Sequence, residues 1–401
     1  MANVSSSNGL EKYPKLRFPG FDEPWEIFKA ENLFENISDK NHSSETVLTI
    51  IQGKGTLPRG QAGRNIHYDE ASLINYKKVN KGDFIIHLRS FEGGLEMANE
   101  SGIVSPAYTI LRCNKQHSSL FYEAYFHTDE FINHILSKSV EGIRDGRQIS
   151  YDAFKWLGLP YCSADEQWKI AQLFYTLNKR IEKQQALVEA LKKYKRGVVQ
   201  HVFRDLKKTE KNWTLVRLGD IFRKVSRRNA NGEIKNVITN SAEYGLIPQR
   251  DFFDKDIAVE GNTSSYYVIE NGDFVYNPRK SHTAPYGPFN QYTRNEKGII
   301  SPLYTCLVLK SSINPSYLAW YFKSDAWYRY IYDNGSQGVR HDRVSMTDDL
   351  LMGIPVSFPS YCKQTKIEKM LNQVESRLSI TYNEYELLIK MRNALMLQLF
   401  I

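Results

Sequence analysis

The chain repeats one sequence pattern twice, and this repeat limits its fold more than any other feature. Residues 25–38 resemble residues 213–226, and residues 101–109 resemble residues 297–305. Shorter matches occur in the same order, namely 81–85 with 271–275, 157–160 with 352–355, and 167–170 with 364–367. A period near half the chain is too long for a solenoid, whose repeats have about 20–50 residues. The pattern therefore predicts two copies of one domain in tandem, which could contact two similar targets.

The composition is that of a globular protein with a basic surface. The chain has 401 residues, enough for two or three domains, and a net charge of +8 that favours a polyanionic partner. Its four cysteines, Cys113, Cys162, Cys306 and Cys362, are far apart, so neither a zinc site nor a disulfide framework is expected. The N-terminus lacks the apolar run of a signal peptide, and no apolar stretch approaches the length of a membrane span. We therefore expect a cytoplasmic protein.

Each half of the chain is predicted to contain a mixed α/β domain followed by one long helix. Short apolar and β-branched runs predict strands at 47–51, 84–88, 108–111, 274–276 and 304–309. Asn314 and Pro315 predict the N-cap and first turn of a short helix in the second copy. Residues 53–80 and 241–265 resemble each other poorly, which predicts a shared framework with different loops. The expected domains are residues 1–162, a central helix 163–206, residues 207–359, and a C-terminal helix 360–401.

The two predicted helices, at about 163–203 and 360–400, carry a heptad pattern. Neither contains proline, and each would be roughly 60 Å long at about 1.5 Å per residue. Alternating steps of four and three predict the narrow seam of a left-handed coiled coil. The predicted seam consists of Phe174, Leu177, Ile181, Val188, Leu191, Val198 and Val202 on the first helix, and Leu371, Val374, Leu378, Tyr385, Leu388, Leu395 and Leu399 on the second.

Polar residues interrupt both seams at matching steps, Gln184 with Thr381 and Lys195 with Arg392. In a parallel pair Lys195 would face Arg392, whereas in an antiparallel pair each polar residue would meet an apolar one and the basic stems would extend to solvent. The antiparallel pair is favoured. The predicted fold class is therefore α+β, with two tandem mixed α/β domains joined by two long helices in an antiparallel coiled coil. A domain would lie near each end, the two would be related by a pseudo-twofold axis, and the helices would act as a ruler.

The sequence lacks the motifs that would indicate catalysis. Residues 52–56 contain the letters of a phosphate-binding loop, but Gly-Lys-Ser/Thr is not contiguous, so a turn is the simpler interpretation. Asn277-Pro278-Arg279 lacks the second proline and the aromatic residue of the Asn-Pro-Pro-Tyr motif of base methyltransferases. No Gly-x-Ser-x-Gly segment occurs, and the histidines do not have metal-ligand spacing. We therefore expect a binding protein with no catalytic residues and no metal site.

Basic residues fall at corresponding places in the two copies and are candidates for DNA contact. Arginine in loops can pair with guanine or hold phosphates, although an arginine bonded to loop carbonyls would be structural. Arg59 and Arg64 lie in a stretch that looks unique to the first copy, which makes them candidates for reading sequence there. The corresponding candidates are Arg89 with Arg279 and Lys280, and Arg144 and Arg147 with Arg340 and Arg343.

Several motifs, in order and twice over, resemble the specificity subunit of type I restriction–modification enzymes. The segment Lys15-Leu-Arg-Phe-Pro-Gly-Phe21, followed by Pro24-Trp25-Glu26, resembles the lead into that family's first target-recognition domain. The Gly-Ile-Val/Ile-Ser-Pro-x-Tyr segments at 102–108 and 298–304 resemble its internal signature. Residues 160–170 and 355–367 resemble the Pro…Glu-Gln-x-Lys-Ile entry to its spacer helices, with Lys363 in place of the usual glutamate. The helices end in Val202-Phe203 and Leu399-Phe400, as the family's often end in Leu-Phe.

The resemblance implies that each domain reads one half of a split, asymmetric DNA target, mainly through the major groove. It implies that the helices fix the gap, with half-sites about one DNA turn (about 34 Å) apart. It also implies partners: double-stranded DNA, two methyltransferase (modification) subunits that dock on the helices, and restriction subunits. S-adenosylmethionine, ATP and Mg²⁺ would be bound by those partners, and this chain would have no cofactor.

Three other interpretations stay open at the sequence level. The chain could be the recognition subunit of a related restriction system whose single partner both methylates and cleaves DNA. It could be a stand-alone enzyme, although this needs a catalytic motif that the sequence lacks. It could be a coiled-coil adaptor that binds only proteins, in which case duplex DNA would not bind with a steep salt dependence.

Overall fold

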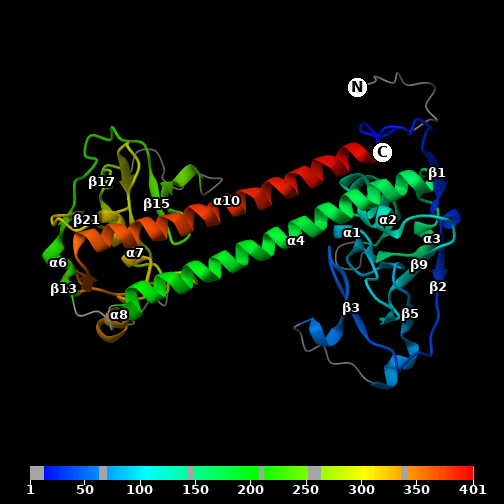
Figure 1. Cartoon of the computed structure of the whole chain (residues 1–401), viewed down its shortest axis with the longest axis horizontal. Coiled ribbons are helices and arrows are strands. Elements are labelled where there is room, and N and C mark those ends of the chain that lie inside the picture. Colours follow the sequence, from blue (N-terminus) through cyan, green and yellow to red (C-terminus); the bar gives the residue numbers. More distant parts are fainter. Residues whose placement is uncertain are drawn as a thin grey trace. The chain divides into compact units, whose positions relative to one another are not determined.

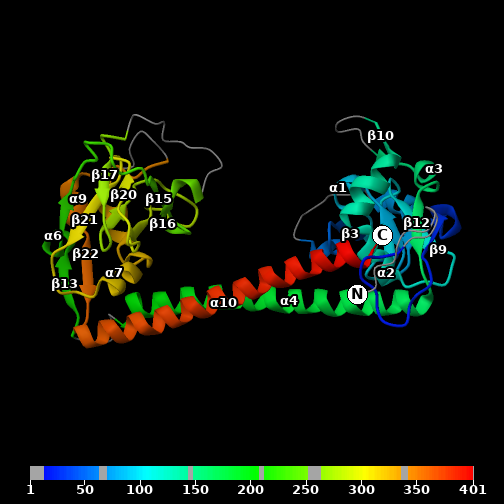
Figure 2. The same ribbon diagram turned by 90° about the horizontal axis from the view of Figure 1, so that it is seen from above.

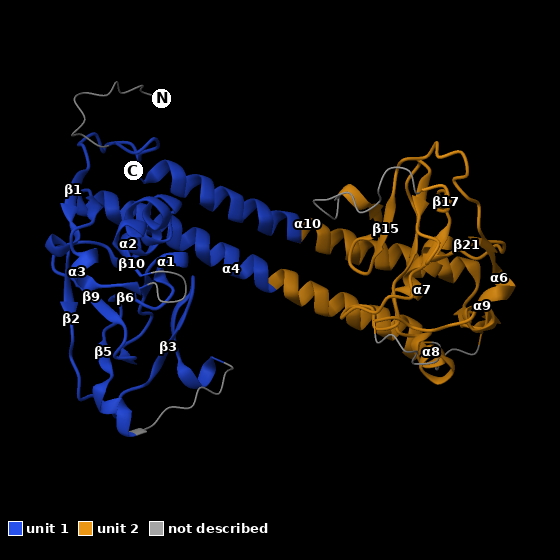
Figure 3. Ribbon diagram, turned by 180° about the vertical axis from the view of Figure 1, so that it is seen from behind, with its two compact units in different colours: residues 1–186, 382–401 blue, residues 187–381 orange. Residues whose placement is uncertain are grey.

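The computed structural model describes residues 13–62, 70–142, 148–206, 212–251, 263–335 and 342–400. The chain divides into two compact units (Figure 3). Unit 1 comprises Met1–Ala186 and Tyr382–Ile401, and unit 2 comprises Leu187–Thr381. Both are mixed α/β structures, as the sequence predicts.

Each unit is built on a four-stranded antiparallel sheet with the same strand order. In unit 1 the order is β2 (Phe34–Ile37), β9 (Thr109–Cys113), β6 (Phe84–Ile86) and β7 (Glu96–Met97). In unit 2 it is β14 (Phe222–Val225), β21 (Thr305–Leu309), β18 (Phe274–Tyr276) and β19 (Phe289–Gln291). The two central strands carry the sequence repeats. Strands β6 and β18 begin at the phenylalanine of the Gly-Asp-Phe repeat, and strands β9 and β21 directly follow the Ser-Pro-x-Tyr repeat. The repeat in sequence therefore corresponds to a repeat in topology.

Three two-stranded ribbons also occur in both units. The first ribbon joins β1 (Glu26–Lys29) to β12 (Gly158–Tyr161) in unit 1, and β13 (Thr214–Arg217) to β22 (Pro355–Phe358) in unit 2. The second is a hairpin, β3 (Leu48–Ile51) with β4 (Gly55–Pro58), and β15 (Ile238–Ser241) with β16 (Gly245–Pro248). The third joins β5 (Lys77–Val79) to β8 (Gly102–Val104), and β17 (Tyr267–Ile269) to β20 (Gly298–Ile300). Unit 1 also contains the pair β10 (Val140–Glu141) and β11 (Gln148–Ile149).

Short helices connect the strands. Helix α7 begins where the sequence predicts, because the Asn314 side chain accepts a hydrogen bond from the Tyr317 amide at 3.1 Å and Pro315 occupies the first turn. The short helices of unit 1 are η1 (Ala30–Asn32), η2 (Arg59–Gln61), η3 (Glu70–Asn75), α1 (Ser90–Gly93), α2 (Ser119–Phe126), η4 (Glu130–Ile135), η5 (Leu136–Ser139) and α3 (Tyr151–Phe154). Those of unit 2 are η7 (His201–Leu206), α6 (Leu218–Ile221), η8 (Gln249–Asp251), α7 (Pro315–Phe322), α8 (Tyr328–Asn334) and α9 (Asp348–Met352).

The two long helices, α4 (Ala164–Gln200) and α10 (Tyr361–Leu399), each contribute one segment to unit 1 and one to unit 2 (Figure 3). Within unit 1 they run antiparallel, because Phe174 stacks on Phe400 at 5.8 Å while Gln184 donates to Glu384 at 2.8 Å. Within unit 2 Lys195 lies 2.6 Å from Glu375, and Val202 shares a core cluster with Ile367. Every predicted seam residue is buried or half-buried.

Two polar positions of the seam reach carboxylates on the other helix, Gln184 on Glu384 and Lys195 on Glu375. The Glu375 side chain is partly exposed, so the charged tip of Lys195 keeps contact with water, as the prediction of an extended basic stem requires. The carboxylate partners were not predicted, and they follow from the rule that polar groups near an apolar seam find hydrogen-bond partners.

The cores of both units are rich in aromatic side chains, and the last phenylalanine of a long helix enters each one. Phe400, at the end of α10, lies within 5.4 Å of Phe121 and 5.6 Å of Tyr125, both on α2. In both views the end of α10 lies beside α2 in unit 1 (Figures 1 and 2). In unit 2, Phe203 follows α4 and lies 5.5 Å from Tyr317 and 5.6 Å from Tyr321, both on α7. The Val/Leu-Phe endings in the sequence are therefore core positions.

Candidate nucleic-acid interface

The β3–β4 and β15–β16 hairpins share a backbone frame but carry different tips. Their registers match, with Leu48 opposite Pro58 and Ile238 opposite Pro248. Gly55 and Gly245 occupy the same place after the tip, and both have a left-handed backbone, with φ of 74° and 73°. The exposed tips differ, since they are Gln52-Gly-Lys54 in unit 1 and Ala242-Glu-Tyr244 in unit 2.

This hairpin corrects the prediction that Arg59 lies in a loop unique to the first copy. The shared frame extends through the hairpin to the 3₁₀ turns η2 and η8 that follow it. Arg59 begins η2, so it does not lie in a stretch unique to the first copy, and Gln249 occupies its place in η8. The match was missed because the tip residues differ, while the backbone depends mainly on the glycine and the proline after the tip. The tip that resembles a phosphate-binding loop is a hairpin turn, as its simpler interpretation predicts.

Arg89 and Arg279 occupy equivalent places where the central strands β6 and β18 end. The Arg89 amide donates to Nδ1 of His87 at 3.3 Å, and the Arg279 amide donates to Oδ1 of Asn277 at 2.9 Å. Each arginine is exposed. The side chain two residues earlier thus fixes the backbone of each arginine, while its guanidinium extends to solvent. This local turn explains why the two arginines align in the sequence.

In unit 2 the structure brings together two arginine segments that are far apart in the sequence. Arg279 and Arg343 form an isolated antiparallel bridge. The Val344 amide donates to the Pro278 carbonyl at 2.9 Å, and the Lys280 amide donates to the Asp342 carbonyl at 2.8 Å. Arg343 has one carboxylate nearby, on the adjacent Asp342 at 3.9 Å, and no carboxylate among the described residues forms an ion pair with Arg279.

Like charges directly opposite each other destabilise a β-pair. The bridge between Arg279 and Arg343 therefore has an energetic cost that a bound anion would relieve. Lys280 is half-buried and is the residue after Arg279 in the chain, so it adds a third basic residue to this segment. We name Arg279, Lys280 and Arg343 the basic cluster of unit 2. Its chemistry suits phosphate groups or the acceptor edge of guanine.

A repeated tyrosine, which the sequence analysis did not single out for binding, lies beside arginines in both units. Burial raises the pKa of the Tyr304 hydroxyl, while a hydrogen bond with Thr239 and the charges of Arg279 and Arg343 lower it. In unit 1, burial raises the pKa of Tyr108, and the charge of Arg59 opposes that effect. Both tyrosines end the repeated Ser-Pro-x-Tyr segment. The tyrosine recurs at the same place in both copies, while the arginines near it differ. This recurrence is the sequence signal that could have identified the tyrosine as a candidate.

The remaining sequence candidates divide into those that the structure places and those that it does not describe. Arg59 is half-buried, with its guanidinium 5.9 Å from the Tyr76 ring centre. Arg64, Arg144, Arg147 and Arg340 lie outside the described residues. DNA contact by each of these candidates therefore stays a prediction.

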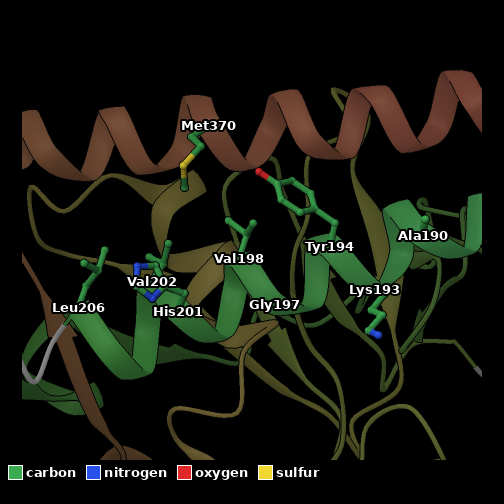
Figure 4. Close-up of a pocket in the computed structure, with 9 residues that line it drawn as sticks. All are labelled: Ala190, Lys193, Tyr194, Gly197, Val198, His201, Val202, Leu206 and Met370. Carbon is green, nitrogen blue, oxygen red and sulfur yellow. The ribbon is translucent and has the colours of Figure 1, made fainter. Parts of the chain in front are cut away.

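A separate groove lies in unit 2, between the last turns of α4 and one side chain of α10. It has a volume of about 810 Å³. In Figure 4, Met370 extends from α10 toward α4, and Tyr194 extends from α4 toward α10. Both are accessible, since Tyr194 is 58% exposed and Met370 is 39% exposed. The lining residues are Ala190, Lys193, Tyr194, Gly197, Val198, His201, Val202, Leu206 and Met370.

Within the ranges given above, no three or more His, Cys, Asp or Glu side chains are grouped so that they could hold a metal ion. In that same part of the chain no helix has the length and apolar character needed to cross a membrane. Cys113, Cys162, Cys306 and Cys362 are free thiols, of which Cys162 and Cys306 are buried.

Comparison with known proteins shows the fold. No protein-family model matches the chain, and no curated protein matches its sequence. Among solved structures, the S subunit of a type I restriction-modification system from M. genitalium matches 97% of this chain and 99% of its own, with a TM-score of 0.56 and 15% identity.

Two further structures match. A chain from work on complex assembly and conformational transition of the type I R-M system covers 95% of this chain and 98% of its own, with a TM-score of 0.51 and 14% identity. The HsdS subunit from Thermoanaerobacter tengcongensis covers 97% and 98%, with a TM-score of 0.48 and 15% identity. In fold, over nearly its whole length, the chain is therefore similar to the S subunit of a type I restriction-modification system.

Proposed function

We propose that this chain is the DNA-specificity subunit of a type I restriction–modification complex. The observation that carries the proposal is the basic cluster of unit 2, where Arg279 and Arg343 lie opposite each other at the end of the central strand. A phosphate or the acceptor edge of guanine could take hydrogen bonds from both arginines. The net charge of +8 and the fold likeness to an S subunit support the same assignment.

Each unit would read one half of a bipartite DNA target. The two hairpins present different tips on one frame, with Gln52 and Lys54 in unit 1 and Glu243 and Tyr244 in unit 2. Different side chains on equivalent backbones would contact different base edges, so the target would be asymmetric. In this proposal residues 1–162 and 207–359 are the recognition domains, and residues 163–206 and 360–401 are the spacer helices.

The long helices would set the gap between half-sites and dock two methyltransferase subunits. A helix of 37 residues, as α4 is, extends about 55 Å at 1.5 Å per residue. The groove beside Tyr194 and Met370 is apolar and accessible, which suits a partner side chain or helix. Catalysis, with S-adenosylmethionine, ATP and Mg²⁺, would belong to the methyltransferase and restriction subunits, and this chain would work in the cytoplasm without a cofactor of its own.

The test is DNA binding by the complex of this chain with its methyltransferase, over a range of salt concentrations. We expect a double variant, Arg279→Ala with Arg343→Ala, to weaken binding and to reduce the slope of log K against log[salt] by about one to two units. If either arginine reads a guanine, the double variant also relaxes base preference in one half-site by about 1–3 kcal/mol.

The matched control is Arg329→Ala on α8. Arg329 is exposed and pairs with Asp333 one helical turn away, so its charge is already compensated. It should leave affinity and salt slope unchanged. If Arg329→Ala and the double variant changed DNA affinity and salt slope equally, the change would come from net charge alone. An unchanged salt slope in the double variant would contradict the proposed contact.

A further inference from the structure

The β3–β4 hairpin of unit 1 is held by a buried carboxylate. Glu96 on β7 is 1% exposed. Its two carboxylate oxygens accept hydrogen bonds from the Gly53 amide at 2.6 Å and from the Gly55 amide at 2.8 Å. These glycines bracket Lys54 at the hairpin tip, so Glu96 fixes the backbone of the residues that the proposed function assigns to DNA contact.

His127 follows α2 and completes this anchor. Its Nδ1 lies 2.8 Å from the Glu123 carbonyl oxygen, and its Nε2 lies 3.4 Å from Oε1 of Glu96. A carbonyl and a carboxylate are both acceptors, so each ring nitrogen has to carry a proton to satisfy them. The contacts therefore select the positively charged imidazolium, next to the buried negative charge of Glu96.

Among the described residues, the other titratable groups near this pair are His87, Glu92 and Glu123, and Lys179 and Glu182 on α4 act electrostatically on Glu123. His87 Nδ1 accepts a hydrogen bond from the Arg89 amide, and burial lowers its pKa, so it is neutral. Glu92 acts electrostatically on His87. Burial raises the pKa of the Glu123 carboxyl, which acts electrostatically on His127 and on Glu96. Within these neighbours His127 is the cation that faces Glu96.

The pKa shifts of the pair agree with the geometry. Burial lowers the pKa of His127, but the hydrogen bond and charge of Glu96 outweigh it, and the net pKa is raised. Burial raises the pKa of Glu96, but the hydrogen bond and charge of His127 and the two glycine amides outweigh it, and the net pKa is lowered. The stability from His127 is therefore complete below about pH 6.5 and lost as pH rises through its raised pKa. The stability from Glu96 is present above about pH 4.3 and lost only as pH falls through its lowered pKa.

Unit 2 holds the equivalent hairpin without a charge. Glu96 pairs with Ile85 across the sheet, and Asn290 pairs with Val275 at the equivalent place. The Asn290 amide donates to Oδ1 of Asn240 at 2.7 Å and to the Ser241 carbonyl at 3.0 Å. Asparagine does not titrate in the physiological range, so this anchor does not depend on pH.

We infer that Glu96 and His127 form a positioning device for the proposed DNA recognition, specific to unit 1 and dependent on pH. Glu96 holds the hairpin that presents Lys54 and leads into Arg59, and charged His127 holds Glu96. When His127 loses its proton, its Nε2 lone pair faces the carboxylate and repels it, so the hairpin is held less firmly. Unit 2, with Asn290 in the same role, keeps its hairpin unchanged. This inference rests on the proposed function.

A matched pair of substitutions tests the anchors in the full chain with its methyltransferase. In Glu96→Gln one of the two acceptor oxygens becomes an NH2 group, so at one of the two glycine amides a donor faces a donor. In Asn290→Asp the new carboxylate faces two acceptors. Hydrogen exchange, expressed as protection factors at fixed pH, should show about tenfold or greater loss at the β3–β4 hairpin in the first variant. In Asn290→Asp the loss of protection should occur at the β15–β16 hairpin and not at β3–β4.

The functional readout is discrimination in each half-site, measured on duplexes with single-base changes. Lys54→Ala identifies the half-site of unit 1. Glu96→Gln should reduce discrimination in that half-site and spare the other, and Asn290→Asp should do the reverse. Between pH 6 and pH 9, discrimination by unit 1 should fall and that by unit 2 should stay constant. His127→Gln, whose side-chain amide can donate to Glu96 without titrating, should remove the pH dependence.

The outcomes separate this inference from the proposed function. If the chain binds no DNA while exchange at the hairpin responds to Glu96→Gln, the anchor stands and the proposed function fails. If the hairpin keeps its protection in Glu96→Gln, the positioning role is overturned. Equal pH dependence in both half-sites, or a wholesale loss of unit 1 protection in place of a local one, would also overturn it.

Discussion

At the scale of single residues, one ion pair explains a difference between the two copies. The Arg17 guanidinium holds Glu166 with two hydrogen bonds, at 2.7 Å and 2.8 Å, and Trp25 Nε1 donates to the same carboxylate at 3.0 Å. The equivalent of Glu166 in the second copy is Lys363. There α4 and η7 precede Trp213, and Asp205 stands at the position in the sequence that Arg17 has in the first copy. The departure of Lys363 from the sequence motif thus has a structural reason.

We predict that Arg17→Ala destabilises unit 1 by about 3–5 kcal/mol, because Glu166 is 1% exposed and would be left as an uncompensated buried charge. Adding Glu166→Gln should recover most of that loss, since a neutral amide still accepts from Trp25. Hydrogen exchange in unit 1 at low urea concentrations measures the loss of stability in Arg17→Ala and its recovery in the double variant. Lys155→Ala, which breaks the exposed pair with Asp152, is the control and should change stability by less than about 0.5 kcal/mol. A small effect of Arg17→Ala would show that the pair is structurally dispensable.

At the scale of elements, the repeated glutamine motif shows what the sequence could and could not predict. Gln167 accepts from the Ser118 amide at 3.1 Å and donates to the Cys162 carbonyl at 2.8 Å. Gln364 makes the same two contacts, with Asn314 and Pro359, each at 2.8 Å. Each glutamine ties the first turn of a long helix to the start of α2 or α7. The sequence marks the residue as repeated, but only the fold shows which distant backbone groups it joins.

The same limit applies to the candidate site. Local signals, such as the helix cap at Asn314 and the heptad seam, were predictable because neighbouring residues decide them. The bridge between Arg279 and Arg343 depends on contacts across 64 positions of sequence, which periodicity does not encode. Glu96 and Asn290 escaped notice for the same reason, since an acid and an amide at equivalent places do not look like a repeat.

We predict that the phenylalanine after each long helix stabilises the unit in which that helix ends, which is unit 1 for α10 and unit 2 for α4. Phe400→Ala removes a ring that packs on Trp25, Phe121 and Phe174, and should destabilise unit 1 by about 3–5 kcal/mol. Phe203→Ala should destabilise unit 2 to a similar extent, because Phe203 packs on Tyr317 and Tyr321. Amide hydrogen-exchange rates, measured separately for unit 1 and unit 2 in each variant, test both expectations. Trp168→Ala, at a 59% exposed position on α4, is the control. Loss confined to the other unit in either variant would contradict the assignment.

At the scale of the whole molecule, one backbone frame occurs twice and carries different hairpin tips. The sheets share a strand order, the hairpins share a register, and the tips differ in sequence. Under the proposed function, two distinct specificities would come from one architecture, because loops vary more freely than the frame that supports them. The helices α4 and α10 would then join two recognition units in one chain, as a split target with a fixed gap requires.

The most direct test of this claim is to co-express the chain with its methyltransferase subunit and map methylated adenines across the host genome. The account predicts a two-part, asymmetric motif with a gap of constant length. Lengthening α4 and α10 together by one heptad, about 10 Å of helix, should then widen the gap by about three base pairs and leave both half-sites unchanged. A continuous short motif, or a stable complex that methylates nothing, would contradict the account and favour a protein-binding adaptor.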